Sequence, residues 1–175
     1  FEVLSSGHRN PQGLYVMDED IFITEHGPAG GDEINLIKKG KHYGYPYYSY
    51  GFAYSKDDIF RKPHSNGFEK PIYYFSPSIA TSEISFYKED QFNKWQNKFI
   101  VAGLGSESLW LLDYDMENKR FMSQEKIYIG HRVRDFGISQ NGAIAIITDD
   151  QNILRLQKSK NPKWNTKNVK KVSFP

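Results

Sequence analysis

Two segments of the sequence pair arginine side chains with groups that suit a small anionic ligand. Arg9 and Asn10 precede a predicted strand, where a bidentate cation and an amide could bind a carboxylate and a carbonyl of one molecule. Arg132 and Arg134 lie two residues apart, so a strand would place both guanidinium groups on one face. Arg132 and Arg134 could also be ordinary surface charge, and taken singly that is the simpler explanation.

A second group of residues offers oxygen ligands for a metal ion. His26, Gly27 and Pro28 end a predicted strand, and a Gly-Pro step can turn its carbonyl groups toward a cation. Asp32 and Glu33 follow on a glycine-rich segment that we expect to be a flexible loop. Carboxylate and carbonyl oxygens suit calcium rather than zinc. The alternatives are an ordinary turn, a packed or exposed histidine, and two solvated acids without EF-hand spacing.

The overall composition excludes several classes of protein. The chain has 175 residues with 23 basic and 21 acidic side chains, a balance that argues against a dedicated nucleic-acid binder. No apolar run approaches the roughly 20 residues that span a bilayer, and the first residues lack the pattern of a signal peptide. The absence of cysteine removes disulfides, cysteine-ligated zinc and thiol catalysis.

Short aromatic and β-branched runs, separated by Gly, Pro, Asn and Asp, predict an all-β fold without a helix of normal length. The Asn-Gly step at 141–142 indicates a tight turn between two of these runs. The predicted strands cover residues 1–5, 13–17, 21–26, 34–37, 72–75, 84–87, 98–104, 108–113, 126–129, 134–138, 143–148 and 153–157.

These strands group into three units of about 40 to 50 residues, which predicts blades of a β-propeller. The first two units have four strands each, the last has three, and residues 1–5 would be the outer strand of a further blade. A propeller needs at least about four blades to close, so we expect an open face at each end. The partial propeller spans residues 1–157, and a Lys- and Asn-rich arm spans 158–175. A β-sandwich is the alternative.

Four stretches carry longer motifs: GHRNPQGL at 7–14, EHGPAGGDEINLIKKGKHYGYP at 25–46, PSIA at 77–80 and RVRD at 132–135. Together they resemble the soluble PQQ-dependent sugar dehydrogenases, specifically the aldose sugar dehydrogenase branch of the glucose/sorbosone dehydrogenase superfamily. The first two motifs are long and unusual, so the similarity is specific. It implies a six-bladed propeller of which this chain is the C-terminal half, with about three blades.

The resemblance implies two cofactors, pyrroloquinoline quinone (PQQ) and calcium. The residues that it implies in contact with PQQ are Arg9, Asn10, His26, Tyr73, Ser78, Arg132 and Arg134. Gly27 and Pro28 are implied to hold calcium beneath PQQ through their carbonyl groups. Glu33 and Tyr43 match ligands of a second, structural calcium.

The activity implied is oxidation of an aldose sugar at C1 to a lactone, with the electrons passing from PQQ to an acceptor. The family's catalytic base is a histidine of the N-terminal half, so no catalytic residue is expected here and the isolated chain is expected to be inactive. Tyr45 and Ser76 stand where the family has tryptophan, which leaves the preferred sugar open. The family is typically periplasmic or secreted.

Two further hypotheses concern function and assembly. A non-catalytic propeller module, stabilised by calcium, could instead bind carbohydrate or protein. The two arginine segments favour the enzyme, because a scaffold has no need of four aligned cofactor groups. Unpaired strand edges need cover, and the remaining blades would come from a missing N-terminal half or, by strand counting, from a second copy in a homodimer.

Overall fold

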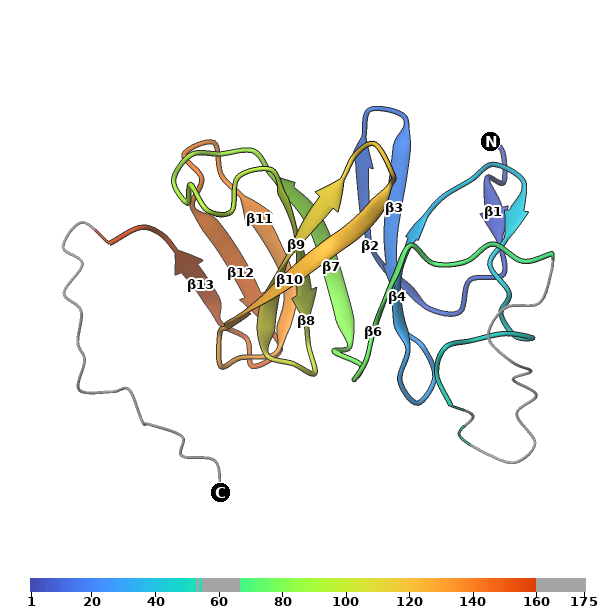
Figure 1. The fold of residues 1–175 in the computed structure, drawn as a ribbon. Helices are drawn as coiled ribbons and strands as arrows, with labels where there is room; N and C mark the ends of the chain where they lie inside the picture. Colours follow the sequence, from blue (N-terminus) through green and yellow to red (C-terminus); the bar gives the residue numbers. More distant parts are fainter. Residues whose placement is uncertain (53, 55–66, 160–175) are drawn as a thin grey trace, which may run out of the picture.

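Three antiparallel sheets stand side by side in the computed structural model, which describes residues 1–52, 54 and 67–159 (Figure 1). Within these ranges the regular elements are all strands, so the all-β prediction is confirmed. The same ranges contain no helix that is long and apolar enough to cross a membrane. Residues 160–175, most of the predicted arm, lie outside the described part of the chain.

Most strands of the three sheets coincide with the predicted runs, but β7 and β10 start three and six residues earlier than predicted. The first sheet has the order β2 (Pro11–Met17), β3 (Asp20–Glu25), β4 (Asp32–Leu36) and β6 (Tyr73–Phe75). The second has the order β7 (Thr81–Tyr87), β8 (Lys98–Gly103), β9 (Ser108–Asp115) and β10 (Arg120–Tyr128). The third has the order β11 (Val133–Ile138), β12 (Ile144–Thr148) and β13 (Ile153–Leu156).

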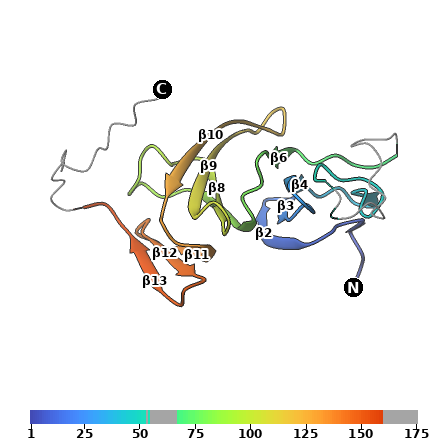
Figure 2. The same cartoon turned by 90° about the horizontal axis from the view of Figure 1, so that it is seen from below.

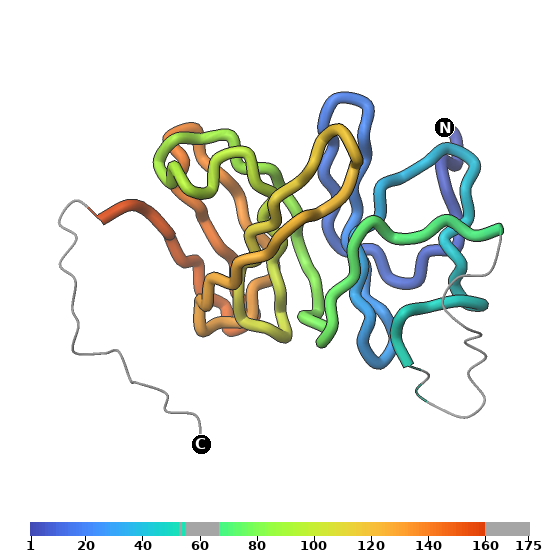
Figure 3. The backbone as a smooth tube through the Cα atoms, viewed as in Figure 1, coloured from blue at the N-terminus to red at the C-terminus, as the bar shows by residue number. Residues whose placement is uncertain are grey.

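Each sheet is a meander whose strands are ordered as along the chain, as the trace in Figure 3 shows. In the first sheet the short strand β5 (Lys41–His42) comes between β4 and β6 in the sequence but pairs outside the sheet. The first strands of the sheets are neighbours, since β7 contacts both β2 and β11. Seen from below, each sheet extends outward from its first strand (Figure 2). Meanders that fan out in this way are blades of a β-propeller, so the prediction of about three blades is confirmed and the sandwich is excluded.

Two apolar clusters join the blades. One lies between the first and second sheets and includes Phe22, Ile34 and Phe99, with the rings of Phe22 and Phe99 in contact. The other lies between the second and third sheets and includes Leu111 and Ile144. All five side chains are almost completely buried, so the packing between blades holds the strand ends in fixed relative positions.

The prediction of a strand over residues 1–5 is wrong for residues 1–4. The short strand β1 (Ser5–Ser6) instead pairs in parallel with β5 (Lys41–His42). Leu4 makes a single main-chain contact there, accepting a hydrogen bond from the Gly40 N–H at 2.7 Å. Alternating apolar residues form a strand only where a neighbouring strand completes the ladder, and the strand that pairs here is short.

Asp32 and Glu33 are also placed differently from the prediction. They are the first two residues of β4 rather than part of a flexible loop, and Asp32 is only 2% exposed. Pairing with β3 on one side and β6 on the other fixes both residues in the sheet. The two carboxylates therefore point to opposite faces of the strand.

Candidate functional site

The predicted site residues cluster because the first strand of every blade starts at the same edge, the lower edge in Figure 1. Arg9 and Asn10 precede β2, Ser78 lies in the loop before β7, and Arg132 precedes β11. The turn after β3 returns to the same edge, because β3 is antiparallel to β2. One edge of the propeller thus carries loops from all three blades.

Hydrogen bonds of Thr81 and Ser82 connect these loops. His26 Nε2 donates to the Thr81 carbonyl at 2.6 Å, and Thr24 Oγ1 donates to the Ser82 carbonyl at 2.8 Å. Ser82 Oγ donates to the carbonyl of Val133 at 2.8 Å. Val133 is the residue between the two predicted arginines, so the start of β7 connects the end of β3 directly to the arginine pair.

Glu25 organises the Arg9 side of this edge. Its buried carboxylate accepts hydrogen bonds from the main-chain N–H of Arg9 at 2.7 Å and from Asn35 Nδ2 at 2.6 Å, and pairs with His8 Nδ1 at 3.0 Å. Three donors around one buried carboxylate make a rigid anchor. The residue was not singled out from the sequence, although it opens the EHGP stretch.

Arg9, Asn10 and His26, three of the predicted cofactor contacts, lie next to one another. Arg9 Nη1 donates to the His26 carbonyl at 3.2 Å, and Asn10 Nδ2 lies 3.4 Å from His26 Nδ1. His26 thus lies between Asn10 and the Thr81 carbonyl, which its Nε2 binds. A guanidinium, an amide and an imidazole in contact form a site suited to a ligand with carboxylate and carbonyl oxygens.

The turn that begins at Gly27 is too tight for any other residue. A Cβ atom on Gly27 would lie 1.9 Å from the Gly30 carbonyl oxygen. The Pro28 carbonyl accepts the Gly30 N–H at 3.0 Å, which leaves one of its two lone pairs for a further partner. The turn therefore holds the predicted carbonyl ligands in a defined conformation.

Asp32 ties this turn to the loop before β7. Its Oδ1 accepts the Gly27 N–H at 3.2 Å, and its Oδ2 accepts the N–H groups of Ile79 and Thr81 at 3.0 and 3.2 Å. Since Ser78 immediately precedes Ile79, the carboxylate also fixes the predicted Ser78 at this edge. Asp32 therefore holds these two loops together. The alternative of a solvated acid, which the sequence analysis left open, does not apply to it.

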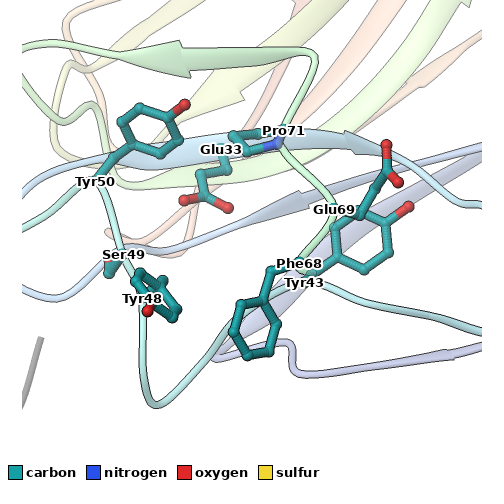
Figure 4. Close-up of a pocket in the computed structure, with 8 residues that line it drawn as sticks. All are labelled: Glu33, Tyr43, Tyr48, Ser49, Tyr50, Phe68, Glu69 and Pro71. Atoms are coloured by element: carbon teal, nitrogen blue, oxygen red, sulfur yellow. The ribbon is translucent and has the colours of Figure 1, made fainter. Parts of the chain in front are cut away.

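Glu33 lies in a narrow cavity of about 20 Å³, enough for one ion or water molecule. Figure 4 shows its carboxylate between the rings of Tyr48 and Tyr50 on one side and that of Phe68 on the other. Burial, followed by the negative charge of Glu25, raises the pKa of Glu33 to about 8. A hydrogen bond from Asn35 partly opposes this rise. A buried carboxylate without a cation is costly, so the cavity fits a bound cation.

Tyr43 lines the same cavity, but its phenol is already engaged. The hydroxyl donates to the Leu36 carbonyl and accepts the Lys38 N–H at 3.0 Å. Burial raises the pKa of Tyr43 to about 12, so the phenol remains protonated. Only its main-chain oxygen is left as a ligand. No group of three His, Asp or Glu side chains within the described ranges has the arrangement of a metal site, so a cation would depend on main-chain oxygens.

Arg132 and Arg134 share one carboxylate, as their spacing predicts for one face of a strand. Arg132 Nε donates to Asp149 Oδ2 at 2.9 Å, and Arg134 Nε donates to Oδ1 at 2.7 Å. These hydrogen bonds lower the pKa of Asp149, which therefore stays ionised. Both guanidinium groups are about half exposed, so the pair can still bind a second anion. Asp149 was not found from the sequence.

Tyr73 differs from the other predicted PQQ contacts, because its side chain binds residues outside the predicted site. Its hydroxyl donates to Gln124 Oε1 at 2.6 Å, and its ring stands edge-on to Phe75 and Phe121. Gln124 belongs to β10, so Tyr73 connects the outer strands of the first two blades. Its predicted contact with PQQ stays a prediction.

Comparisons with known proteins agree with this architecture. A family model for glucose/sorbosone dehydrogenases matches residues 1–155. The aldose sugar dehydrogenase YliI of Escherichia coli (strain K12) is 34% identical over 160 residues, which are 85% of this chain and 41% of that protein. The crystal structure of the soluble aldose sugar dehydrogenase from Escherichia coli in the apo form has a TM-score of 0.80 at 32% identity, over 88% of this chain and 46% of that one.

A further solved structure is the PQQ-bound form of the aldose sugar dehydrogenase from Streptomyces coelicolor. It has a TM-score of 0.65 at 25% identity and covers 89% of this chain and 45% of that one. The chain thus spans about two fifths of the YliI sequence and less than half of the two solved structures. With blades of the PQQ sugar dehydrogenase type and a family match over most of its length, the chain belongs to the glucose/sorbosone dehydrogenase family.

Proposed function

We propose that this chain is the C-terminal part of a quinoprotein oxidoreductase that oxidises aldose sugars at C1 to lactones with PQQ and calcium. The observation that carries the proposal is that Arg9, Asn10 and His26 meet at the propeller edge where β11 presents Arg132 and Arg134. The similarity to a PQQ-bound aldose sugar dehydrogenase supports the same cofactor.

The arginines supply the charge for an anionic cofactor. The bound cofactor would supply the hydride acceptor for the sugar. Arg9 is positioned by its own main-chain bond to Glu25, and Arg132 and Arg134 by Asp149. Two guanidinium groups held by one carboxylate keep a net positive charge, which is the complement of a carboxylate on the ligand.

Calcium is the proposed metal at two places. The carbonyl groups of Gly27 and Pro28 would hold one ion against the cofactor as a Lewis acid, and the turn that presents them is fixed by Asp32. Glu33 and the main-chain oxygen of Tyr43 would hold a second, structural ion in the narrow cavity. Hard oxygen donors of this kind match the preference of calcium.

The remaining parts of the enzyme are also proposals. The base that removes the sugar's hydroxyl proton would come from blades outside this chain, in an N-terminal half. An electron acceptor would reoxidise the cofactor. A periplasmic or secreted location follows from the family resemblance.

The proposal is tested by calorimetric titration of the calcium-loaded chain with PQQ, together with a dye-reduction assay on aldoses. We expect calcium-dependent binding without turnover, and binding about tenfold weaker for Arg134→Gln, which removes a charge-assisted contact. Arg155→Gln, an exposed arginine of β13, is the matched control. Turnover by the chain alone would contradict the assignment of the base to other blades. Calcium binding without PQQ binding would favour a non-catalytic, calcium-stabilised module.

A further inference from the structure

The cation site proposed at Glu33 and the cofactor site proposed at Arg9 are neighbours in space. Glu33 and Tyr43 line the narrow cavity that fits a cation (Figure 4), and both also line a second cavity of about 10 Å³. Arg9, Glu25 and His26 line that second cavity as well. A volume of this size holds at most about one water molecule. Any influence of one site on the other therefore passes through side chains in contact rather than through a shared ligand.

Asn35 connects Glu33 to Glu25. Its side-chain nitrogen donates to Glu25 Oε1 at 2.6 Å and to Glu33 Oε2 at 3.4 Å. Asn35 is completely buried, and its Oδ1 has no hydrogen-bond partner within the described ranges. The bonds to the two carboxylates therefore fix the plane of the amide. Because hydrogen bonds in such a network polarise one another, a change of charge at Glu33 alters the bond that Asn35 donates to Glu25.

His8 makes a second connection to Glu25, starting from Tyr43. The imidazole ring stacks on the Tyr43 ring at a centroid distance of 4.6 Å and an angle of 26°, and its Nδ1 lies 3.0 Å from Glu25 Oε1. Its Nε2 lies 2.9 Å from Ser5 Oγ, so contacts at both ring nitrogens and on one ring face hold the imidazole. Two separate routes thus lead from the residues proposed to hold the structural ion to the same carboxylate.

Glu25 in turn holds Arg9. Its second oxygen, Oε2, accepts the Arg9 main-chain N–H at 2.7 Å, and the Arg9 guanidinium donates to the His26 carbonyl at 3.2 Å. Glu25 is only 3% exposed, so water and salt screen charges near its carboxylate only weakly. A cation beside Glu33 would stabilise the negative charge of Glu25, and with it the charge-assisted hydrogen bond that fixes the main chain of Arg9.

We propose that Glu25 is a positioning residue that couples the two sites: a cation at Glu33 fixes Arg9 and raises the affinity of the Arg9 site for an anionic ligand. The inference rests on the proposed function for the identity of the two ligands, calcium and PQQ. Coupling between two binding sites is reciprocal, so the anionic ligand raises the affinity of the Glu33 cavity for the cation by the same factor.

The first test is a calcium titration of the full chain without PQQ, followed by NMR. The main-chain amide signal of Arg9 reports its hydrogen bond to Glu25. We expect calcium to shift this signal saturably in the wild type, and we expect Glu33→Gln, which removes the proposed ligand of the structural ion, to lose most of the shift. A shift of the same size in Glu33→Gln would come from an ion at Gly27 and Pro28 and would overturn the proposal. An Arg9 signal that calcium does not move would also overturn it.

The second test changes the two connecting residues. Asn35→Ala removes the bonds to both carboxylates and is expected to reduce the calcium-induced shift of Arg9 and to weaken PQQ binding at saturating calcium about fivefold. His8→Phe keeps a ring against Tyr43 but loses the bond to Glu25, and the same direction of change is expected. Since the His8 side chain is 14% exposed, this variant serves if Asn35→Ala does not fold. Asn118→Ala, which loses a bond to Asp115 in the exposed β9–β10 turn, is the matched control.

The two tests separate this coupling from the proposed function. A calcium-induced shift of Arg9 that depends on Glu33, without any binding of PQQ, would support the coupling and contradict the quinoprotein assignment. Calcium-dependent PQQ binding that is equally tight in the wild type, Asn35→Ala and His8→Phe would agree with the quinoprotein assignment and overturn the coupling.

Discussion

Glu33 is a buried acid whose charge depends on whether a cation is present. Burial and the Glu25 carboxylate raise its pKa from 4.5 to about 8. In the metal-free chain the folded state keeps a proton that the unfolded state releases between these values. The free energy of unfolding therefore falls as the pH rises from 4.5 to about 8.

Glu33→Gln is expected to remove this pH dependence. The neutral variant should be more stable than the wild type at pH 9 in EDTA by about 2 kcal/mol, since it avoids a buried charge. Calcium should stabilise the wild type and have little effect on the variant. Urea unfolding with and without calcium measures both effects, and parallel pH profiles for the two proteins would contradict this account of Glu33.

Asp149 is the opposite case, a carboxyl whose pKa is lowered from 3.8 by hydrogen bonds from Arg132 and Arg134. Its pairing therefore stabilises the fold above pH 3.8, and this contribution is lost as the pH falls through the lowered pKa. Arg134→Gln is expected to move the pKa back toward 3.8, followed by carboxyl-carbon NMR. Arg155→Gln should leave it unchanged. If the pKa of Asp149 were the same in Arg134→Gln as in the wild type, Asp149 would not hold the two arginines as a pair.

At the scale of elements, β2 and β7 meet closely at Gly13. A Cβ atom there would lie 2.6 Å from the Ser82 carbonyl oxygen and 2.7 Å from the Ile84 nitrogen, both main-chain atoms that cannot move aside. Gly13→Ala is therefore expected to lower the free energy of unfolding by about 2–3 kcal/mol. Gly137→Ala is the control, because no atom lies within 4 Å of its added Cβ. Similar losses in urea unfolding for both variants would argue against close contact between these blades.

At the scale of the whole molecule, Phe99 couples the first two blades. Its ring is fully buried and contacts Tyr15 and Phe22 of the first sheet and Tyr114 of its own. Phe99→Ala is expected to cost about 3–5 kcal/mol, with the fluorescence and circular dichroism transitions still coincident. Ile153→Ala, at an exposed position, should change stability by less than about 0.5 kcal/mol. Separate transitions for the two probes would show that the blades unfold independently.

Apolar side chains are exposed on the two outer faces of this row of blades. Tyr15 packs into the first cluster, so Leu14 and Val16 of β2 face the other way and remain more than half exposed. Ile153 of β13 is exposed in the third sheet. These faces suit further blades, as the proposed assembly requires. The further blades would come from an N-terminal half or from a second copy of this chain. Sedimentation equilibrium distinguishes the two, because a monomer at all concentrations argues against a second copy.

The sequence by itself determined most of the strands and their grouping into blades, and it named the residues that we propose as cofactor contacts. Period-two alternation and turn residues act within a few positions, so the bounds of β2 or β12 could be predicted locally. The spacing of two between Arg132 and Arg134 likewise determined that they share a face. The glycine-rich turn after His26 could also be predicted, because turn residues act locally in the sequence.

Only the tertiary structure decided the partners of these residues. Asp32 binds main-chain groups 47 and 49 residues away, and the Tyr73 hydroxyl binds Gln124, 51 residues away. Residues 1–4 did not become a strand, because a strand depends on what pairs with it. Contacts between distant segments arise from the packing of one blade on the next, and no local pattern in the sequence specifies which donor will face which carboxylate.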